Sequence, residues 1–314
     1  ERMKKLSPKQ RTRLGELWKK ASTEQNEGVN KGQLFVKILD YVQSSRKQQK
    51  TEDTLTRNDT FADSNYQFPR EQKAFLEKTK RYWHQWRGPE ATGMSVTASP
   101  PVTWSEENNI RWKVPLKGQG NASPIVWDDK IFVLAAVDTK VVDPSLPPPE
   151  EQPERVFGIT FPNTLFQFEV LCFDRFTGKK LWQQTATEKV PHEGTHHHAD
   201  FACASPVTDG ERLYCWFGSA GMYCYSLDGT LLWKRDLGEV RVGASLGEGC
   251  SPVLHHGRII IVRDHSGQSS IEVLEAATGQ TVWKHTRDEK NAWATPKIFT
   301  EDGERTQVIT ADSK

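Results

Sequence analysis

A four-stranded unit recurs along this sequence and constrains the fold more than any other feature. Its clearest copy is ASPVTDGERLYCWFGSAGMYCYSLDGTLLWKRDL, at residues 204–237. Short β-branched or aromatic runs alternate there with turns of two to four residues that are rich in Gly and Asp. This alternation is typical of antiparallel hairpins, so the unit predicts four short strands joined as a meander.

Two short marks recur with the unit. The first is Ser-Pro or Thr-Pro, which begins at Ser123, Ser205, Ser251 and Thr295. The second is a Gly-containing turn followed by Trp, and from Trp182 to Trp233 to Trp283 the spacings are 51 and 50 residues. A four-stranded unit at this period is typical of a β-propeller blade, and neighbouring blades must stack because one sheet cannot bury both of its faces alone. The sequence therefore predicts an all-β fold, a β-propeller of four-stranded antiparallel blades.

The number of units in the chain predicts an incomplete propeller. Residues 110–114 predict an outer strand, three whole blades follow, and a single hairpin at 297–310 comes last. An open arc of about 3.5 blades would expose long strand edges. We therefore expect this sequence to be a fragment whose propeller is incomplete at the C-terminus.

Residues 1–82 differ from the rest in composition and pattern. Residues 1–80 hold 18 Lys and Arg against 11 Asp and Glu, so this part is basic although the whole chain has a net charge of only +1. We expect a small α-helical N-terminal extension with a linker at residues 1–82, followed by the propeller at 83–314. The helices are expected at 5–22, 33–44 and 70–82, and the linker at 45–69. The loop between the first two helices lacks the acidic ligands of an EF-hand, so a plain helical hairpin is the better interpretation.

The five cysteines are scattered and include no adjacent pair: Cys172, Cys203, Cys215, Cys224 and Cys250. Cysteines placed in strand-like runs in this way are more typical of small buried hydrophobic residues than of a disulfide framework. Cys215 and Cys224 lie on neighbouring predicted strands, so one bridge between these strands stays open as an alternative.

Candidate site residues fall in the loops between blades. Such loops, together with the connections between the second and third strands of each blade, are expected to open on one side of the propeller. The densest chemistry there is a His-rich segment, in which His192, His196, His198 and Asp200 are candidate metal ligands. The alternative is a hydrated loop that binds metal only adventitiously. We identify no catalytic residue, because the motifs of hydrolases, zinc proteases and phosphate loops are absent from the sequence.

The tryptophans of the repeat are candidates for a different role. Trp112, Trp182, Trp233 and Trp283 occupy the same place in successive units. A residue that recurs at one position of every blade is expected to serve packing between blades rather than to form a ligand cage.

Several motifs together carry a resemblance to a known family. They are WHQWRGP at 83–89, PVTW at 101–104, NIRWKV at 109–114, and the repeated Ser-Pro and Thr-Gly…Trp units. In these features residues 83–314 resemble the pyrroloquinoline-quinone-like (PQQ-like) β-propeller repeat proteins, and most of all an extracytoplasmic set from planctomycete-type bacteria. The repeat is also similar to that of quinoprotein dehydrogenases and of the lipoprotein propeller of the β-barrel assembly machinery. His84 departs from the family pattern, in which Pro is expected.

The resemblance implies a function but leaves alternatives open. Quinoprotein dehydrogenases hold PQQ beside an adjacent Cys–Cys disulfide and a calcium ion, and this chain has no adjacent cysteines. We therefore expect a non-catalytic scaffold or binding module of the cell envelope, periplasmic or otherwise extracytoplasmic, with a protein or glycan ligand on the loops between blades. The alternatives are a PQQ-dependent dehydrogenase with calcium, whose binding residues stay unknown, and a metal-dependent enzyme built on the His-rich loop. We expect no nucleic-acid partner, and the sequence shows neither a transmembrane stretch nor a signal peptide.

Overall fold

In the computed structural model of the chain, the described residues are 75, 77–95, 97–301 and 305–311. The helices expected at 5–22 and 33–44 and the linker at 45–69 lie outside these residues. Of the helix expected at 70–82, Phe75 and residues 77–79 are described and are helical. The domain boundary after residue 82 stays a prediction, and Phe75 and Tyr82 both pack against Trp127 of the first β-strand.

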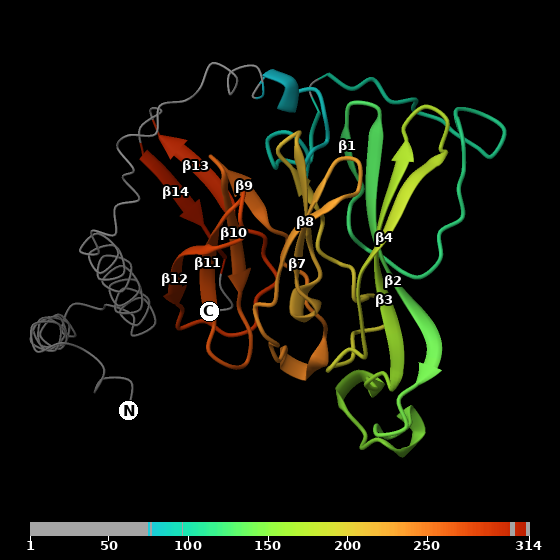
Figure 1. The fold of residues 1–314 in the computed structure, drawn as a ribbon, viewed down its shortest axis with the longest axis vertical. Helices are drawn as coiled ribbons and strands as arrows, with labels where there is room; N and C mark the ends of the chain where they lie inside the picture. The colour runs from blue at the N-terminus through green and yellow to red at the C-terminus, as the bar shows by residue number, and fades with distance from the viewer. Residues whose placement is uncertain (1–74, 76, 96, 302–304, 312–314) are drawn as a thin grey trace, which may run out of the picture. The chain divides into compact units, whose positions relative to one another are not determined.

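The sheets have the meander topology that the repeat predicts. Three four-stranded antiparallel sheets follow one another along the chain, each with its strands paired in sequence order, and a two-stranded hairpin comes after them (Figure 1). The first blade comprises β1 Ile125–Trp127, β2 Lys130–Val142, β3 Thr164–Asp174 and β4 Lys180–Lys189. The second comprises β5 Val207–Thr208, β6 Arg212–Trp216, β7 Met222–Ser226 and β8 Leu231–Arg235. The third comprises β9 Val253–His255, β10 Arg258–Arg263, β11 Ser270–Glu275 and β12 Thr281–Thr286, and the hairpin comprises β13 Lys297–Glu301 and β14 Arg305–Ile309.

Short 3₁₀ turns interrupt the connections between strands. They are η3 Pro149–Glu151, η4 Val156–Gly158, η5 Gly218–Ala220 and η6 Gly243–Ser245. The prediction of an all-β fold built from four-stranded antiparallel blades is confirmed. Among the described residues, none forms a helix with the length and hydrophobicity that a membrane span requires.

The outer strand predicted at residues 110–114 does not form. In the part of the chain that the structure describes, these residues belong to no sheet. A strand exists only through hydrogen bonds to a neighbouring strand, and no described strand lies beside this segment in a sheet. The prediction of a strand at 110–114 is therefore wrong for the described residues, because this segment has no paired neighbour among them.

Blade stacking buries both faces of the second sheet. Leu213 and Cys215 of β6 belong to a core cluster with residues of β1, β2 and β3, whereas Tyr214 and Trp216 belong to one with residues of β10 and β11. Successive side chains of a strand point to opposite faces, so a continuous apolar run lets β6 contact both neighbours. Each large side chain buried in this way contributes about 1.5–3 kcal/mol.

The alternation of side chains along a strand also shows whether Cys215 and Cys224 can form a disulfide. Cys215 is paired with Tyr223 across β6 and β7, and Cys224 is paired with Tyr214. Cys215 therefore faces the first blade and Cys224 faces the third. The open alternative of a bridge between them is wrong, because their side chains lie on opposite faces of the sheet. All five cysteines are free, and four of them are buried.

Trp182 and Trp233 join one blade to the next, and Trp112 joins the segment at 110–114 to the first blade in the same way. From Nε1, Trp112, Trp182 and Trp233 donate to the carbonyl oxygens of Arg175, Leu227 and Ala276, each over 3.0 Å. Each indole also lies against the glycine of that turn. At Gly279, for example, φ is +69° and a Cβ atom would stand 2.6 Å from the Trp233 ring. The glycine is required both for its left-handed backbone and for the close approach of the ring. The Trp of one unit thus packs on the Gly of the next unit, which explains why the two residues recur together.

The Ser-Pro and Thr-Pro motifs form a second set of hydrogen bonds between successive units. The backbone N–H of Ser123 donates to Ser205 Oγ over 2.9 Å, that of Ser205 to Ser251 Oγ over 3.0 Å, and that of Ser251 to Thr295 Oγ1 over 3.0 Å. Each blade thus supplies a hydroxyl acceptor to the blade before it. This explains why the position is Ser or Thr in every copy.

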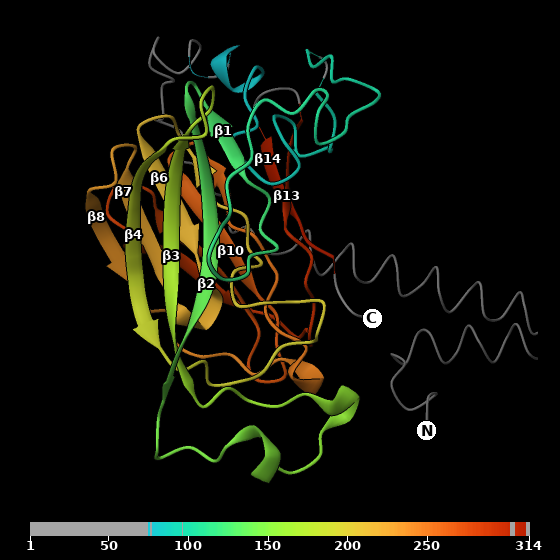
Figure 2. The same cartoon turned by 90° about the vertical axis from the view of Figure 1, so that its right-hand side faces the viewer.

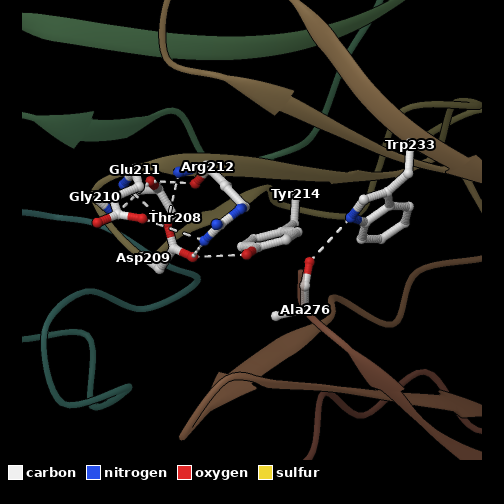
Figure 3. A network of polar contacts seen from close by, with 8 residues as sticks. All are labelled: Thr208, Asp209, Gly210, Glu211, Arg212, Tyr214, Trp233 and Ala276. Atoms are coloured by element: carbon white, nitrogen blue, oxygen red, sulfur yellow. Dashed lines mark hydrogen bonds and ion pairs between the residues drawn. The ribbon is translucent and has the colours of Figure 1, made fainter. Parts of the chain in front are cut away.

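A partly buried polar network fixes the hairpin of β5 and β6 (Figure 3). The Asp209 carboxylate accepts the Tyr214 hydroxyl over 2.7 Å, an Arg212 guanidinium N–H over 3.3 Å, and the backbone N–H groups of Glu211 and Arg212 over 2.9 and 2.6 Å. Tyr214 is completely buried, and its burial raises its pKa. Its ring centroid lies 6.1 Å from that of Trp233, so this network lies beside the junction with the third blade.

The connections between strands define two faces of the blades. The turn face carries the turns β1–β2 and β3–β4 of each blade, which bond to each other through Arg175 N–H and Asp129 O over 2.7 Å and through Ala276 N–H and Gly257 O over 2.9 Å. The loop-rich face carries the β2–β3 connections and the segments between blades. Longer loops on a rigid scaffold are where binding sites usually lie.

Candidate functional site

Loops from successive blades are bonded to one another on the loop-rich face. The Glu193 carboxylate, in the segment between the first and second blades, accepts the N–H of Val242 over 2.9 Å. His192 Nε2 lies 2.7 Å from the carbonyl oxygen of Val240. Both partners belong to the segment between the second and third blades, so these two residues join neighbouring segments into one surface.

Glu248 makes the next connection. Its Oε1 accepts the backbone N–H of Ser219 over 2.9 Å, and a Cβ atom at Gly218 would lie 2.6 Å from the Glu248 carboxylate. The absence of a side chain at Gly218 is what lets the carboxylate approach the backbone of η5. Burial raises the pKa of Glu248, while the hydrogen bond from Ser219 acts in the opposite direction.

A hollow lies among these loops. It has a volume of about 590 Å³ when counted out to open solvent. Its apolar part is formed by Phe168, Phe201, Trp216 and Phe217, and its polar part includes Lys189, His192, Glu193 and Glu248. Lys189 Nζ donates to the carbonyl oxygen of Ser219 over 3.1 Å and to Glu239 Oε1 over 3.4 Å. The charged groups around the hollow therefore bind neighbouring loops.

The four predicted metal ligands do not form one ligand set. His192 lies against Val240, as described above, and Asp200 is buried with its Oδ1 accepting the N–H of Ala202 over 2.7 Å. The ring centroids of His196 and His198 each lie 4.0 Å from that of His197 and 5.4 Å from each other. In the chain as far as it is described, no group of three or more His, Cys, Asp or Glu side chains could hold a metal ion.

The side chains around this hollow do not fit PQQ, the quinone cofactor of the dehydrogenase alternative. A quinone with several carboxylates needs cations that are free to pair with it. Among the described residues that line the hollow, Lys189 is the one Lys or Arg side chain, and it already donates to Ser219 and Glu239. Glu193 and Glu248 accept backbone N–H groups in the same way. We derive no chemistry through a quinone or calcium ion at this hollow.

The connection between β2 and β3 of the first blade is long and has an internal structure that the sequence does not reveal. The N–H of Asp143 donates to the carbonyl oxygen of Asn163 over 2.7 Å and closes residues 143–163 into a lobe, here called the insertion lobe. Within it, the Gln152 side chain accepts the N–H of Phe161 over 2.8 Å and donates to the carbonyl oxygen of the same residue over 2.8 Å. A lone Gln in a Pro-rich segment carries no signal for such a contact.

Comparison with known proteins agrees with the fold. Residues 167–310 match the family described as outer membrane protein assembly factor BamB. No protein of curated function matches the sequence.

Several solved structures are similar to the chain in fold. A europium-containing methanol dehydrogenase is 14% identical with a TM-score of 0.41, over 67% of this chain and 33% of its own. The quinohemoprotein alcohol dehydrogenase ADHIIG from Pseudomonas putida HK5 is 16% identical with a TM-score of 0.38, over 68% and 28%. BamB from Moraxella catarrhalis is 14% identical with a TM-score of 0.27, over 43% and 37%.

The matched part of each of these structures is thus well under half of its length. The Ser-Pro and Thr-Gly…Trp junctions, the four-stranded blades and the match over residues 167–310 lead to one conclusion. Residues 167–310 of this chain are similar to the PQQ-like β-propeller repeat family, and the described blades have the fold that this repeat predicts.

Proposed function

We propose that this chain is a non-catalytic propeller that binds a protein partner through its loop-rich face, outside the cytoplasm. The observation that carries the proposal is the use of Glu193, Glu248 and His192, three acid–base side chains of this face, to join one loop to the next. A general acid or base must be within hydrogen-bond reach of the reacting group. Here these side chains instead hold backbone groups of neighbouring loops.

A surface fixed in this way favours binding. Loops that are ordered before the partner arrives lose less conformational entropy on association, so more of the contact free energy appears as affinity. The description of the matching family as an outer membrane assembly factor supports a protein partner and an extracytoplasmic place.

The proposal can be tested by site-specific crosslinking in cells that make the full-length protein. A photoreactive amino acid replaces Arg241 or Lys290, which are exposed in segments between blades, or Lys179, which is exposed on the turn face and serves as the control. We expect one defined protein to crosslink at the first two positions and not at Lys179. That protein should then bind the purified chain.

Calorimetry on the same full-length protein tests the alternatives. Titration with PQQ in the presence of calcium is expected to give no binding. Stoichiometric binding of PQQ at micromolar affinity, or crosslinks that are equal on both faces, would refute the proposal. A metal-dependent enzyme on the His-rich loop would require zinc to be retained by the purified protein and lost with His192→Ala and His196→Ala.

A further inference from the structure

The insertion lobe is carried well away from the blade core. Strands β2 and β3 have 13 and 11 residues, whereas the corresponding β6 and β7 of the second blade have 5 residues each. The long hairpin therefore projects beyond the other sheets, with the insertion lobe at its end (Figure 2).

The lobe is held in one shape by its own contacts. Besides its two bonds to Phe161, Gln152 Nε2 donates to the carbonyl oxygen of Pro147 over 3.1 Å, and Arg155 Nη1 donates to Gln152 Oε1 over 3.0 Å. The Arg155 guanidinium also lies 3.9 Å from the centroid of the Phe161 ring. Three successive prolines at 147–149 restrict the backbone further. The segment is a preorganised element rather than a slack connection.

The tip of the lobe presents apolar side chains to solvent. Val156 is 59% exposed and Phe157 is 66% exposed. The backbone of Phe157 is left-handed, with φ 60° and ψ 15°, a conformation that aromatic residues rarely adopt. Such strain persists where the surrounding structure enforces it, and it is found preferentially at functional sites.

Beside this tip lies an open groove between the insertion lobe and the His-rich segment. Counted out to solvent, its volume is about 900 Å³. The aromatic residues that line it are Phe157, Phe161, Phe166 and Phe201. Phe166 and Phe201 pack edge to face with centroids 5.1 Å apart. The two walls meet at Gly194, where a Cβ atom would lie 2.4 Å from the carbonyl oxygen of Thr160.

Three acidic residues follow a residue of the groove in sequence, and this part of the lobe is here called the acidic rim. Pro149 lines the groove, and Glu150, Glu151 and Glu154, which follow it in the lobe, are all exposed. Within the described part of the chain, none of these three carboxylates forms an ion pair. An aromatic groove with unpaired carboxylates at its edge complements a segment that is apolar in the middle and basic at its flanks.

We propose that this groove binds an extended segment of a protein partner, which places an aromatic or large aliphatic side chain beside Phe157 and Phe201 and Lys or Arg side chains opposite the acidic rim. This inference rests on the proposed function and names the part of the loop-rich face that does the binding. Aromatic side chains in water-excluding contacts usually carry most of the binding energy of an interface.

The test uses the full-length protein and a displayed library of short random peptides as the probe. We expect enriched peptides to combine aromatic or large aliphatic residues with flanking Lys or Arg. Phe157→Ala should weaken an enriched peptide about thirtyfold, as for an interface hot spot. Phe176→Ala is the matched control, because Phe176 is also an exposed phenylalanine, at 53%, but lies on the turn face.

Two further variants separate binding from folding. Phe157→Gly relieves the left-handed strain, so it should fold at least as well as the wild type and still lose the peptide. Replacement of Glu150, Glu151 and Glu154 by Gln should weaken binding about tenfold or more at low salt and less at high salt.

Other outcomes overturn the inference. They are an absence of enriched peptides, enrichment of acidic peptides, or equal binding by Phe157→Ala and Phe176→Ala. The crosslinking at Arg241 and Lys290 is read separately. If the partner crosslinks there but the Phe157 variants bind it as the wild type does, the proposed function stands and the groove is wrong.

Discussion

The two faces of the blades are built by different means. On the turn face one contact is made three times, by Trp112, Trp182 and Trp233, each with its indole N–H on the next turn. On the loop-rich face the bonds of His192, Glu193 and Glu248 are each made once among the contacts described above, and only the Ser-Pro bonds at the start of the blades are repeated there. The comparison teaches that the repeat fixes how blades join, whereas the other face is free to differ from blade to blade.

The largest expected effect tests whether the turn face holds the blades together. Trp233→Ala removes a large side chain and its bond to Ala276, and we expect a loss of about 3–5 kcal/mol in the free energy of unfolding. Urea unfolding followed by circular dichroism measures it. Trp104→Ala is the control, since Trp104 is 68% exposed, and it should change stability little. Equal losses in the two variants would break the comparison.

A pH dependence should also arise beside the turn face, at His84. This residue is buried, its ring meets that of Trp127, and burial lowers its pKa from 6.5 to about 4. The unfolded chain therefore binds a proton that the folded chain does not between these values, so stability is complete above pH 6.5 and falls as pH is lowered toward 4. The loss is about 3 kcal/mol at most.

Thermal unfolding between pH 4 and 7 measures this dependence. His84→Gln should reduce the slope but not abolish it, because burial also lowers the pKa of His255 to about 4, whereas His198→Gln, an exposed position on the loop-rich face, should leave the slope as it is. If His198→Gln flattened the slope and His84→Gln did not, the loop-rich face would be the one that limits stability in acid.

Two glycines of the turn face allow the ring contact to be measured separately from the backbone conformation. Gly279 and Gly257 have similar left-handed backbones, with φ +69° and +71°, but only Gly279 has the Trp233 ring against it, and nothing lies within 4 Å of a Cβ atom at Gly257. Alanine at either position should cost about 1 kcal/mol for the backbone. Gly279→Ala should lose about 1–3 kcal/mol more from overpacking. Chemical denaturation of both variants gives the difference, and equal losses would show that the ring contact is unimportant.

The smallest effect is expected on the loop-rich face. Glu193→Ala leaves the N–H of Val242 without its carboxylate, which should cost about 1 kcal/mol or less because water can replace the acceptor. Hydrogen exchange at the Val242 amide should accelerate while global stability changes little. Glu193→Gln keeps an acceptor and should retain most of the protection. If Glu193→Ala lowered the free energy of unfolding as much as Trp233→Ala does, both faces would contribute equally to joining the blades.

The fold was predictable because its signal is repeated. The Ser-Pro and Thr-Gly…Trp marks each occur several times, so chance matches average out and the blades at 125–189, 207–235 and 253–286 follow from the spacing. The strand at 110–114 was wrong because a local pattern says nothing about whether a pairing partner is present.

The loop-rich face was less predictable for the same reason. The candidate ligands His192, His196, His198 and Asp200 are close in sequence, but their directions depend on contacts with Val240, Ala202 and each other that no local pattern encodes. The contacts of Gln152 occur once in the chain, so no second copy could reveal them. Only their position on the loop-rich side followed from the order of strands in a blade.

The bonds between Ser123, Ser205, Ser251 and Thr295 have a direction, because each blade gives an N–H forward and receives nothing back through this contact. Every such junction is heterologous, in the sense used for head-to-tail subunits, and is made by the same pair of groups. Duplication or deletion of a whole unit would therefore leave this backbone-to-hydroxyl contact matched at every junction, as in other linear repeat arrays. The junction-specific contacts of Glu193 and Glu248 would have to be replaced, so the loop-rich face is where such a change would have its cost.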